Sequence, residues 1–249
     1  MSSSIEFRNA TVRAASGQVI VRDLNLKIAD GEAVAFVGRS GAGKTTSLRL
    51  INGLAQASSG SVRVAGRPLE QHDLIALRRR IGYVIQGSGL LPHRTVYDNI
   101  AVVPRLLEWD EERTRRRARE LMELLRLDWD GYLHRFPRTL SGGEQQRVGI
   151  ARAMVANPDV LLCDEPFGAL DPIVRRELQE TFCRLRDEAG TTIVFVTHDL
   201  SEATRIGKRI IMFEGGSIVA DVPTDEFRNL SHPAVRQFVE AASGYGAAR

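Results

Sequence analysis

The sequence predicts an α/β protein with a parallel-sheet core, an antiparallel β subdomain at the N-terminus and an inserted helical subdomain. Residues 5–12 and 19–28 alternate apolar and polar side chains, as half-buried antiparallel strands do. Continuous apolar runs at residues 33–37, 160–163 and 192–196 are typical of parallel strands buried on both faces. Residues 92–156 are mostly helical in character, so we expect them to interrupt the core.

Domain organisation follows from the length and from the order of these segments. The 249 residues, 43% of them hydrophobic, can bury one substantial core. We expect a single domain over residues 1–240, with its core in about residues 1–86 and 158–225 and its helical subdomain in about residues 87–157. Small and glycine-rich residues predict a flexible tail over residues 241–249.

A phosphate-binding loop is predicted at residues 38–45, which read GRSGAGKT and fit the pattern G-x-x-x-x-G-K-[ST]. The loop follows an apolar run and precedes a predicted helix, the context that the pattern requires. Glycines let the backbone N–H groups face a β-phosphate, Lys44 neutralises phosphate oxygens, and the Thr45 hydroxyl can ligate Mg²⁺. The expected nucleotide contacts are Gly38, Arg39, Ser40, Gly41, Ala42, Gly43, Lys44, Thr45 and Thr46. Alone, the loop indicates only a P-loop NTPase, a class that includes kinases, GTPases, helicases and motors.

A second anion-binding segment is predicted at residues 140–147, which read LSGGEQQR. Ser141 followed by Glu144 is a capping box, so a helix is expected to begin here. Gly142 and Gly143 are costly choices for capping alone, whereas bare glycines let a phosphate approach the exposed N–H groups of the first turn. We therefore expect Ser141, Gly142, Gly143 and Glu144 to contact a nucleotide in a chain that has one phosphate loop.

Two carboxylates and a histidine follow the apolar runs in the second half of the chain. Asp164 is expected to hold magnesium through water, and Glu165 to polarise an attacking water. A pair of acids at a strand end is as often a solubilising turn, and a lone histidine such as His198 is more often structural. The functional interpretation therefore depends on the whole set of segments.

Together these segments resemble the ABC ATPases, the nucleotide-binding cassettes of ABC transporters, over about residues 5–225. The resemblance implies a P-loop NTPase cassette with a RecA-like core, in which Lys44, Glu165 and His198 are catalytic and His198 contacts the γ-phosphate. It identifies Gln86, after residues 81–85, as the Q-loop glutamine that reaches magnesium and links the core to the helical insert. Asp171, at the end of residues 166–171 (PFGALD), is expected to lie across a dimer interface.

The resemblance also implies cofactors and a partner subunit. ATP and Mg²⁺ are the implied cofactors, with Thr45, Gln86 and Asp164 as metal ligands. In ABC ATPases the signature at residues 140–147 binds the γ-phosphate of the nucleotide held by the opposite subunit. A head-to-tail homodimer, or a pair with another ABC subunit, follows. Gly168 stands where ABC D-loops ordinarily have serine, a mild departure.

One feature of ABC cassettes is missing from the sequence. They usually stack an aromatic residue on adenine about two dozen positions before the phosphate loop, but residues 12–16 read VRAAS. Arg13 can stack through its guanidinium plane, or apolar contacts with Val19 or Val21 can hold the base. We therefore expect weaker discrimination between ATP and GTP than is usual.

Composition excludes several function classes. The 34 Lys and Arg against 31 Asp and Glu leave a net charge of +3, from which no nucleic-acid partner follows. Cys163 and Cys183 make neither a disulfide framework nor a metal cluster, which suits a reducing, cytosolic compartment. The apolar runs are too short to span a bilayer, and the first residues lead into no apolar signal region. Any membrane-spanning part of a transporter must then be another chain.

Residues 81–109 resemble, within the family, the ATPases of bacterial osmoprotectant importers for glycine betaine, choline and carnitine. The resemblance implies transmembrane permease subunits that dock near residues 87–93, an extracytoplasmic substrate-binding protein that acts indirectly, and a peripheral location at the cytoplasmic face of the inner membrane.

Many members of that group carry a C-terminal regulatory domain, which we do not expect here. Importers for methionine or other amino acids and for lipids remain alternatives. A soluble, non-transport ABC ATPase is disfavoured because the chain has one cassette and no sustained heptads between Gln86 and Ser141.

Overall fold

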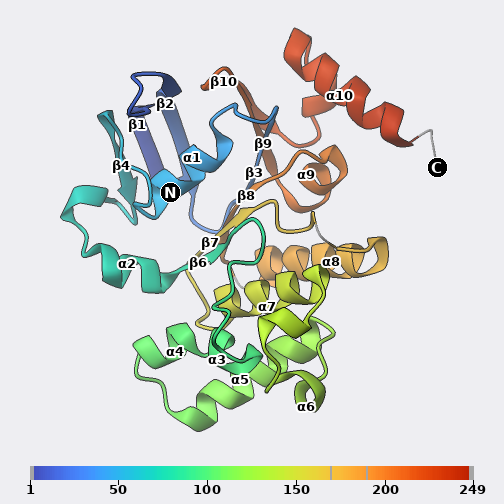
Figure 1. Ribbon diagram of the computed structural model, residues 1–249. Coiled ribbons are helices and arrows are strands. Elements are labelled where there is room, and N and C mark those ends of the chain that lie inside the picture. Colours follow the sequence, from blue (N-terminus) through green and yellow to red (C-terminus); the bar gives the residue numbers. More distant parts are fainter. Residues whose placement is uncertain (1–2, 169, 189, 247–249) are drawn as a thin grey trace.

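A six-stranded sheet forms the centre of the molecule, in the strand order β10-β9-β3-β8-β7-β6 (Figure 1). This computed structural model describes residues 3–168, 170–188 and 190–246. The strands of this sheet are β3 (Ala33–Gly38), β6 (Ile81–Val84), β7 (Val160–Asp164), β8 (Thr192–Val196), β9 (Arg209–Glu214) and β10 (Ser217–Pro223). All neighbours pair in parallel except β9 and β10. The carboxyl ends of β3, β7 and β8 therefore meet at one edge of the sheet, which confirms the predicted α/β core.

A separate antiparallel sheet carries the N-terminal part of the chain, as the alternating pattern predicts. Its strand order is β2-β1-β4-β5, with the bounds β1 (Ser3–Arg13), β2 (Val19–Ala29), β4 (Ser59–Val64) and β5 (Arg67–Pro68). The inward side chains Ile5, Phe7 and Ile28 are buried in one apolar cluster with Phe36 of β3 and Leu48 of helix α1 (Lys44–Ile51). The packing of this sheet thus supports the strand and the helix that flank the phosphate loop.

The helical insert lies below the sheet in Figure 1 and contains the helices that the sequence predicts there. These are α3 (Val96–Ile100), α4 (Val102–Leu106), α5 (Glu111–Leu124), α6 (Trp129–Tyr132) and α7 (Gly142–Met154), with a short 3₁₀ turn, η2 (Pro137–Thr139). The Asp110 side chain caps α5 by accepting a hydrogen bond from the Arg113 N–H at 2.7 Å. Ala118, Leu121 and Met122 form the buried stripe of α5, so its arginines face outward.

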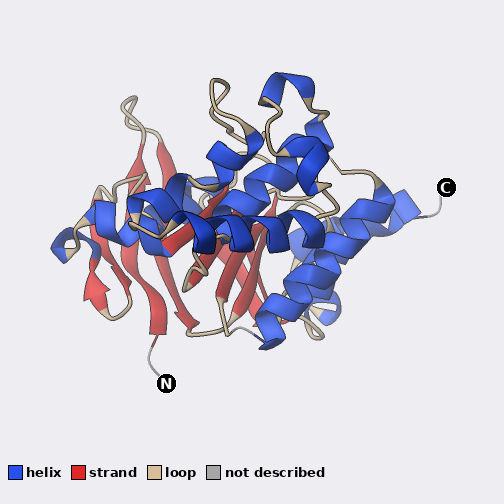
Figure 2. Ribbon diagram, turned by 90° about the horizontal axis from the view of Figure 1, so that it is seen from below, coloured by secondary structure: helices blue, strands red, loops and turns tan. Residues whose placement is uncertain are grey.

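The remaining helices complete the described part of the chain, which Figure 2 shows with helices in blue and strands in red. They are α2 (Leu74–Arg80), α8 (Pro172–Glu188), α9 (Leu200–Ile206) and α10 (Pro233–Gly246), with 3₁₀ turns η1 (Leu69–Gln71) and η3 (Phe227–Asn229). Helix α10 continues to Gly246, so the first six residues of the segment 241–249, expected to be a flexible tail, are helical. Among the described residues, no helix is both long and apolar enough to cross a membrane.

Candidate functional site

The phosphate loop connects β3, which ends at Gly38, to α1, which begins at Lys44. Gly43 precedes the helix with a left-handed φ of 98°, and a Cβ there would lie 2.8 Å from the carbonyl oxygen of Ile20. Only glycine fits this position, because both the backbone angle and the close approach exclude a side chain. No side chain caps the first turn of α1, so its N–H groups stay available for an anion.

The Lys44 side chain reaches back to the residues at which the phosphate loop begins. Its Nζ donates hydrogen bonds to the carbonyl oxygens of Gly38 at 2.7 Å and Arg39 at 2.8 Å. The residue is 7% exposed, and burial lowers the pKa of Lys44 while the carboxylates of Glu165 and Asp164 oppose that change. The loop thus holds a cation beside the N-terminus of α1, which is what phosphate oxygens require.

Thr45 and Asp164, separated by 119 positions in the sequence, are in direct contact. The Thr45 hydroxyl donates to Asp164 Oδ1 at 2.9 Å from the first turn of α1 to the end of β7. Burial raises the pKa of Asp164; the hydrogen bond from Thr45 opposes the rise and the charge of Glu165 adds to it. A hydroxyl and a carboxylate oxygen are ligands that Mg²⁺ prefers, so these two residues fit the predicted metal site.

Glu165 brings together three segments that the sequence analysis singled out. Its Oε2 accepts a hydrogen bond from Gln86 Nε2 at 3.1 Å, and its Oε1 lies 3.5 Å from His198 Nδ1. The Glu165 backbone has a left-handed φ of 48°, which is strained for a residue other than glycine, and its N–H donates to the Val196 carbonyl at 3.0 Å. The hydrogen bond from Gln86 Nε2 leaves the amide oxygen of Gln86 free to act as a metal ligand.

The glycine-rich turn at residues 140–147 has the capping box that its sequence predicts. The Ser141 N–H donates to Glu144 Oε2 at 2.6 Å, and the Glu144 N–H donates to Ser141 Oγ at 3.3 Å. A Cβ on Gly142 would meet nothing within 4 Å, so the first turn of α7 is open to an approaching group. Within the described parts of the chain, no hydrogen bond joins residues 141–144 to the phosphate loop. The two anion-binding segments are therefore separate in one chain.

The segment that follows Gln86 is attached to helix α7. Three successive residues, Gly87, Ser88 and Gly89, have left-handed φ values of 77°, 63° and 51°. Arg152 of α7 donates to the Ser88 carbonyl at 3.0 Å and to the Gly89 carbonyl at 2.8 Å. The Ser88 hydroxyl also donates to Gln145 Oε1 at 3.2 Å. The first part of the segment 87–93 is thus tied to the helix that begins at the signature.

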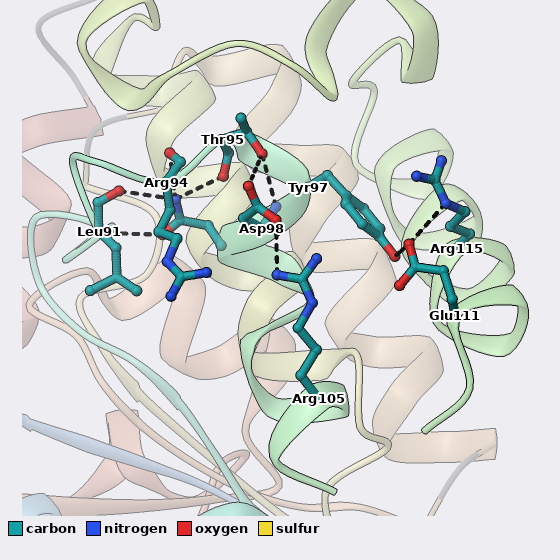
Figure 3. Close-up of polar contacts among 9 residues, drawn as sticks. Leu91, Arg94, Thr95, Tyr97, Asp98, Arg105, Glu111 and Arg115 are labelled. Atoms are coloured by element: carbon teal, nitrogen blue, oxygen red, sulfur yellow. Dashed lines mark hydrogen bonds and ion pairs between the residues drawn. The ribbon is translucent and has the colours of Figure 1, made fainter. Parts of the chain in front are cut away.

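Asn99 holds the second part of this segment in shape. It is completely buried, and its amide donates to the carbonyls of Leu91, Arg94 and Thr95 at 3.1, 3.1 and 2.9 Å while its Oδ1 accepts from the Leu91 N–H at 2.7 Å. Figure 3 labels these three partners, which surround the start of α3.

Two further polar pairs continue from the start of α3 into the insert. Asp98 binds Arg105 at 2.8 Å, and Tyr97 donates to Glu111 at 2.9 Å (Figure 3). Glu111 also accepts from Arg115 at 2.9 Å. Polar contacts thus connect residues 91–95 to α4 and α5.

Asp171 is the N-terminal cap of α8. Its Oδ1 accepts hydrogen bonds from the N–H groups of Ile173 and Val174, both at 3.1 Å. Ala169 of the same PFGALD segment lies outside the described residues. Buried Gln146 of α7 donates to the Pro166 carbonyl at 3.0 Å and so joins the signature helix to this segment.

The family described as ABC transporter matches residues 21–168. The chain belongs to the ABC transporter family. It is 45% identical to the choline transport ATP-binding protein OpuBA of Bacillus subtilis over 236 residues, which are 94% of this chain and 62% of that protein. It is 47% identical to the glycine betaine/carnitine/choline transport ATP-binding protein OpuCA of the same organism over 224 residues, 90% of this chain and 59% of that protein. The chain thus spans about three fifths of the length of these relatives.

Solved structures agree with this assignment. The dimeric ATP-binding cassette MJ0796 bound to ADP and Pi is 32% identical, with a TM-score of 0.82 over 88% of this chain and 98% of that one. A second dimeric structure of MJ0796, described as a bacterial ABC transporter cassette, has a TM-score of 0.83 at 34% identity. These likenesses cover both the core and the insert of the present cassette.

The expected base-binding region of this ABC cassette lies beside its phosphate loop. The turn between β1 and β2 leads into Ile20, whose carbonyl oxygen approaches Gly43. Arg13 is exposed, and its guanidinium is held only loosely, at 3.5 Å from the Gly17 carbonyl. No aromatic side chain occurs in residues 12–20.

Several residues with contacts at the site were missed by the sequence analysis. Gln146 and Arg152 lie on α7, Arg175 on α8, and Glu202 on α9. Gln146 is part of the signature at residues 140–147, and Glu202 comes four positions after His198, so their positions carried some signal. Arg152 contacts backbone carbonyls, and Arg175 contacts the Leu170 carbonyl as well as the Asp199 carboxylate. No sequence pattern can reveal a partner that is a backbone carbonyl.

Proposed function

We propose that this cassette hydrolyses ATP with Mg²⁺ and powers a bacterial importer, most specifically one for quaternary-amine osmoprotectants. The convergence of Gln86, Glu165 and His198 beside the Thr45–Asp164 pair carries the enzymatic part of the proposal. The importer part is supported by the relatives, which are named as choline, carnitine and glycine betaine transport proteins.

In this proposal each site residue has a role that its position supports. Lys44 and the N–H groups of α1 would bind the β- and γ-phosphates, and Thr45, Asp164 and Gln86 would supply oxygen ligands for magnesium. The metal, when bound, neutralises charge on the phosphate oxygens. Glu165 polarises the attacking water and accepts its proton, and His198 both orients Glu165 and contacts the γ-phosphate.

The signature at residues 140–147 extends the proposal to a head-to-tail pair. Because residues 141–144 make no hydrogen bond to the phosphate loop among the described residues, they are free to serve a nucleotide bound by a second chain. Two ATP molecules between two cassettes would hold a closed dimer, and loss of the γ-phosphate would reopen it. The dimeric MJ0796 structures support this form. The second subunit is another copy or a paired ABC subunit.

The remaining partners follow from the same proposal. A transmembrane permease docks beside residues 87–93, and an extracytoplasmic substrate-binding protein takes part indirectly. The cassette then lies peripherally at the cytoplasmic face of the inner membrane. A net charge of +3 gives no reason to invoke a nucleic-acid partner.

A variant of Glu165 tests the enzymatic part of the proposal. Glu165→Gln keeps the shape of the side chain but removes the base, so ATP turnover should fall by about 100-fold or more. With ATP and magnesium the variant should elute as a dimer in size-exclusion chromatography with light scattering, and without nucleotide as a monomer. A variant that stays monomeric with ATP would contradict the head-to-tail pair.

Affinity purification tests the transport part of the proposal. Tagged Glu165→Gln protein, expressed in the native host, should retain a polytopic permease and a quaternary-amine-binding protein, which mass spectrometry identifies. An amino-acid or lipid permease would replace the osmoprotectant assignment with one of the other importers. Recovery of ribosomes or DNA-repair factors would replace the transport function itself.

A further inference from the structure

The loop that carries His198 is built around a buried acid. Glu202 of α9 is 5% exposed, and its Oε2 accepts a hydrogen bond from the Thr197 hydroxyl at 2.5 Å. The same hydroxyl accepts from the Asp199 N–H at 3.0 Å, and the Thr197 N–H donates to the Phe36 carbonyl at 3.1 Å. The residues on both sides of His198 are therefore fixed, although the histidine itself is exposed.

Arg175 connects this loop to the segment that ends at Asp171. Arg175 lies on α8. Its Nη1 is 4.0 Å from Asp199 Oδ2, and its Nη2 donates to the Leu170 carbonyl at 3.4 Å. The other carboxylate oxygen of Asp199, Oδ1, accepts from the Ser201 and Glu202 N–H groups and caps α9. One carboxylate oxygen of Asp199 thus caps α9, and the other faces Arg175.

We propose that Arg175 is a positioning residue that links the D-loop at Leu170 and Asp171 to the His198 loop. The inference rests on the proposed head-to-tail pair, in which Asp171, at the end of residues 166–171 (the D-loop), is expected to lie across the dimer interface. A displacement of Leu170 is passed through the Arg175 guanidinium to Asp199. Because Asp199 is the next residue after His198, the displacement also shifts the His198 backbone. It thereby changes the 3.5 Å contact between His198 Nδ1 and Glu165 Oε1. Contact with the partner is in this way coupled to the alignment of the catalytic pair.

The shape of the side chain is part of the argument. A guanidinium presents several N–H groups in a planar fork and can contact a carbonyl and a carboxylate at once, whereas an ammonium is a single point charge. Arg175→Lys therefore keeps the charge but weakens one of the two contacts. We expect it to behave between the wild type and Arg175→Ala.

The adjacent residue, Arg176, provides a matched control. Arg176 is exposed, and its guanidinium lies 3.7 Å from Glu180 one turn further along α8. Arg176→Ala removes the same side chain from the neighbouring position. It leaves Leu170 and Asp199 untouched.

Hydrogen–deuterium exchange of the nucleotide-free protein tests the link without requiring any activity. In Arg175→Ala, peptides that contain residues 197–199 should exchange about tenfold faster than in the wild type, because the Asp199 N–H is less protected. Arg176→Ala should match the wild type. Equal exchange in Arg175→Ala and the wild type would overturn the link.

Kinetic measurements test the consequence for catalysis. Arg175→Ala should lower the turnover number about tenfold, since small misplacements at an active site reduce rate steeply. The Kd for ATP should change less than about twofold, and the double variant Glu165→Gln/Arg175→Ala should still dimerise with ATP. Turnover equal to that of Arg176→Ala, or equal losses in binding and turnover, would overturn the positioning role. A wild-type protein without turnover would instead reject the proposed function, and the exchange experiment would still decide the link.

Discussion

At the scale of single residues, the candidate site contains acids and bases whose surroundings move their pKa values in opposite directions. Burial lowers the pKa of Lys44 and raises that of Asp164. Burial also raises the pKa of Glu202 on α9, while the hydrogen bond that Glu202 accepts from Thr197 opposes the rise. These residues make the stability of the nucleotide-free cassette dependent on pH.

Glu202→Gln should remove one part of that dependence. A carboxyl whose pKa is higher in the folded than in the unfolded state binds its proton more tightly when folded. The free energy of unfolding therefore falls as pH rises from the ordinary value through the raised one. The variant lacks this titration but keeps an oxygen for Thr197. In urea denaturation, its stability relative to the wild type should increase as the pH rises above the ordinary glutamate pKa, and level off above the raised one. A difference that does not change with pH would contradict the raised pKa.

Base recognition is the second question at the residue scale. Because residues 12–20 offer Arg13 but no aromatic ring, we expect the Kd values for ATP and GTP to differ by less than about tenfold. Arg13→Ala should weaken both by a similar factor, and Arg13→Tyr should favour ATP. Competition binding with a fluorescent nucleotide measures all three proteins. Strong adenine selectivity in the wild type would show that another group reads the base.

At the scale of elements, the connection between the core and the helical insert is a chain of hydrogen bonds rather than a loose hinge. Arg152 of α7 holds Ser88 and Gly89, and buried Asn99 of α3 holds residues 91–95. The proposed permease surface is thus attached to the helix that begins at the signature. Motion of the insert relative to the core would carry that surface with it.

Asn99→Ala tests how much the hydrogen bonds of Asn99 contribute to the stability of the cassette. The change leaves one buried N–H and three carbonyls without their partner, so the free energy of unfolding should fall by about 2–4 kcal/mol. Asn229→Ala, at an exposed position of η3, is the control and should change it by less than about 0.5 kcal/mol. Urea denaturation measures both variants. Equal stability of the two variants would mean that the loop keeps its shape without Asn99.

At the scale of the whole molecule, the separation of the phosphate loop from residues 141–144 has a consequence for kinetics. If each ATP needs groups from two chains, ATP turnover per chain should rise with protein concentration and level off once the dimer is formed. Ser141→Arg should abolish this activity while the nucleotide-free monomer stays folded. Turnover per chain that remains constant down to concentrations where light scattering shows only monomers would contradict the paired site.

The α/β class and the candidate nucleotide-binding residues of this cassette could be predicted from the sequence, because the segments that carry them are local patterns. The phosphate loop, the signature with its Ser141–Glu144 capping box and the acids after β7 each depend on neighbours in the chain, so they could be predicted together with the α/β class. The contacts between residues far apart in the sequence could not be predicted, because they depend on how the strands are ordered and packed. The contacts of Thr45 with Asp164 and of Gln86 and His198 with Glu165 require the strand order of the parallel sheet. Arg152 and Asn99 bind backbone carbonyls, and Arg175 binds the Leu170 carbonyl in the same way. Because every residue has a carbonyl, packing sets these partners and they leave no pattern in the sequence.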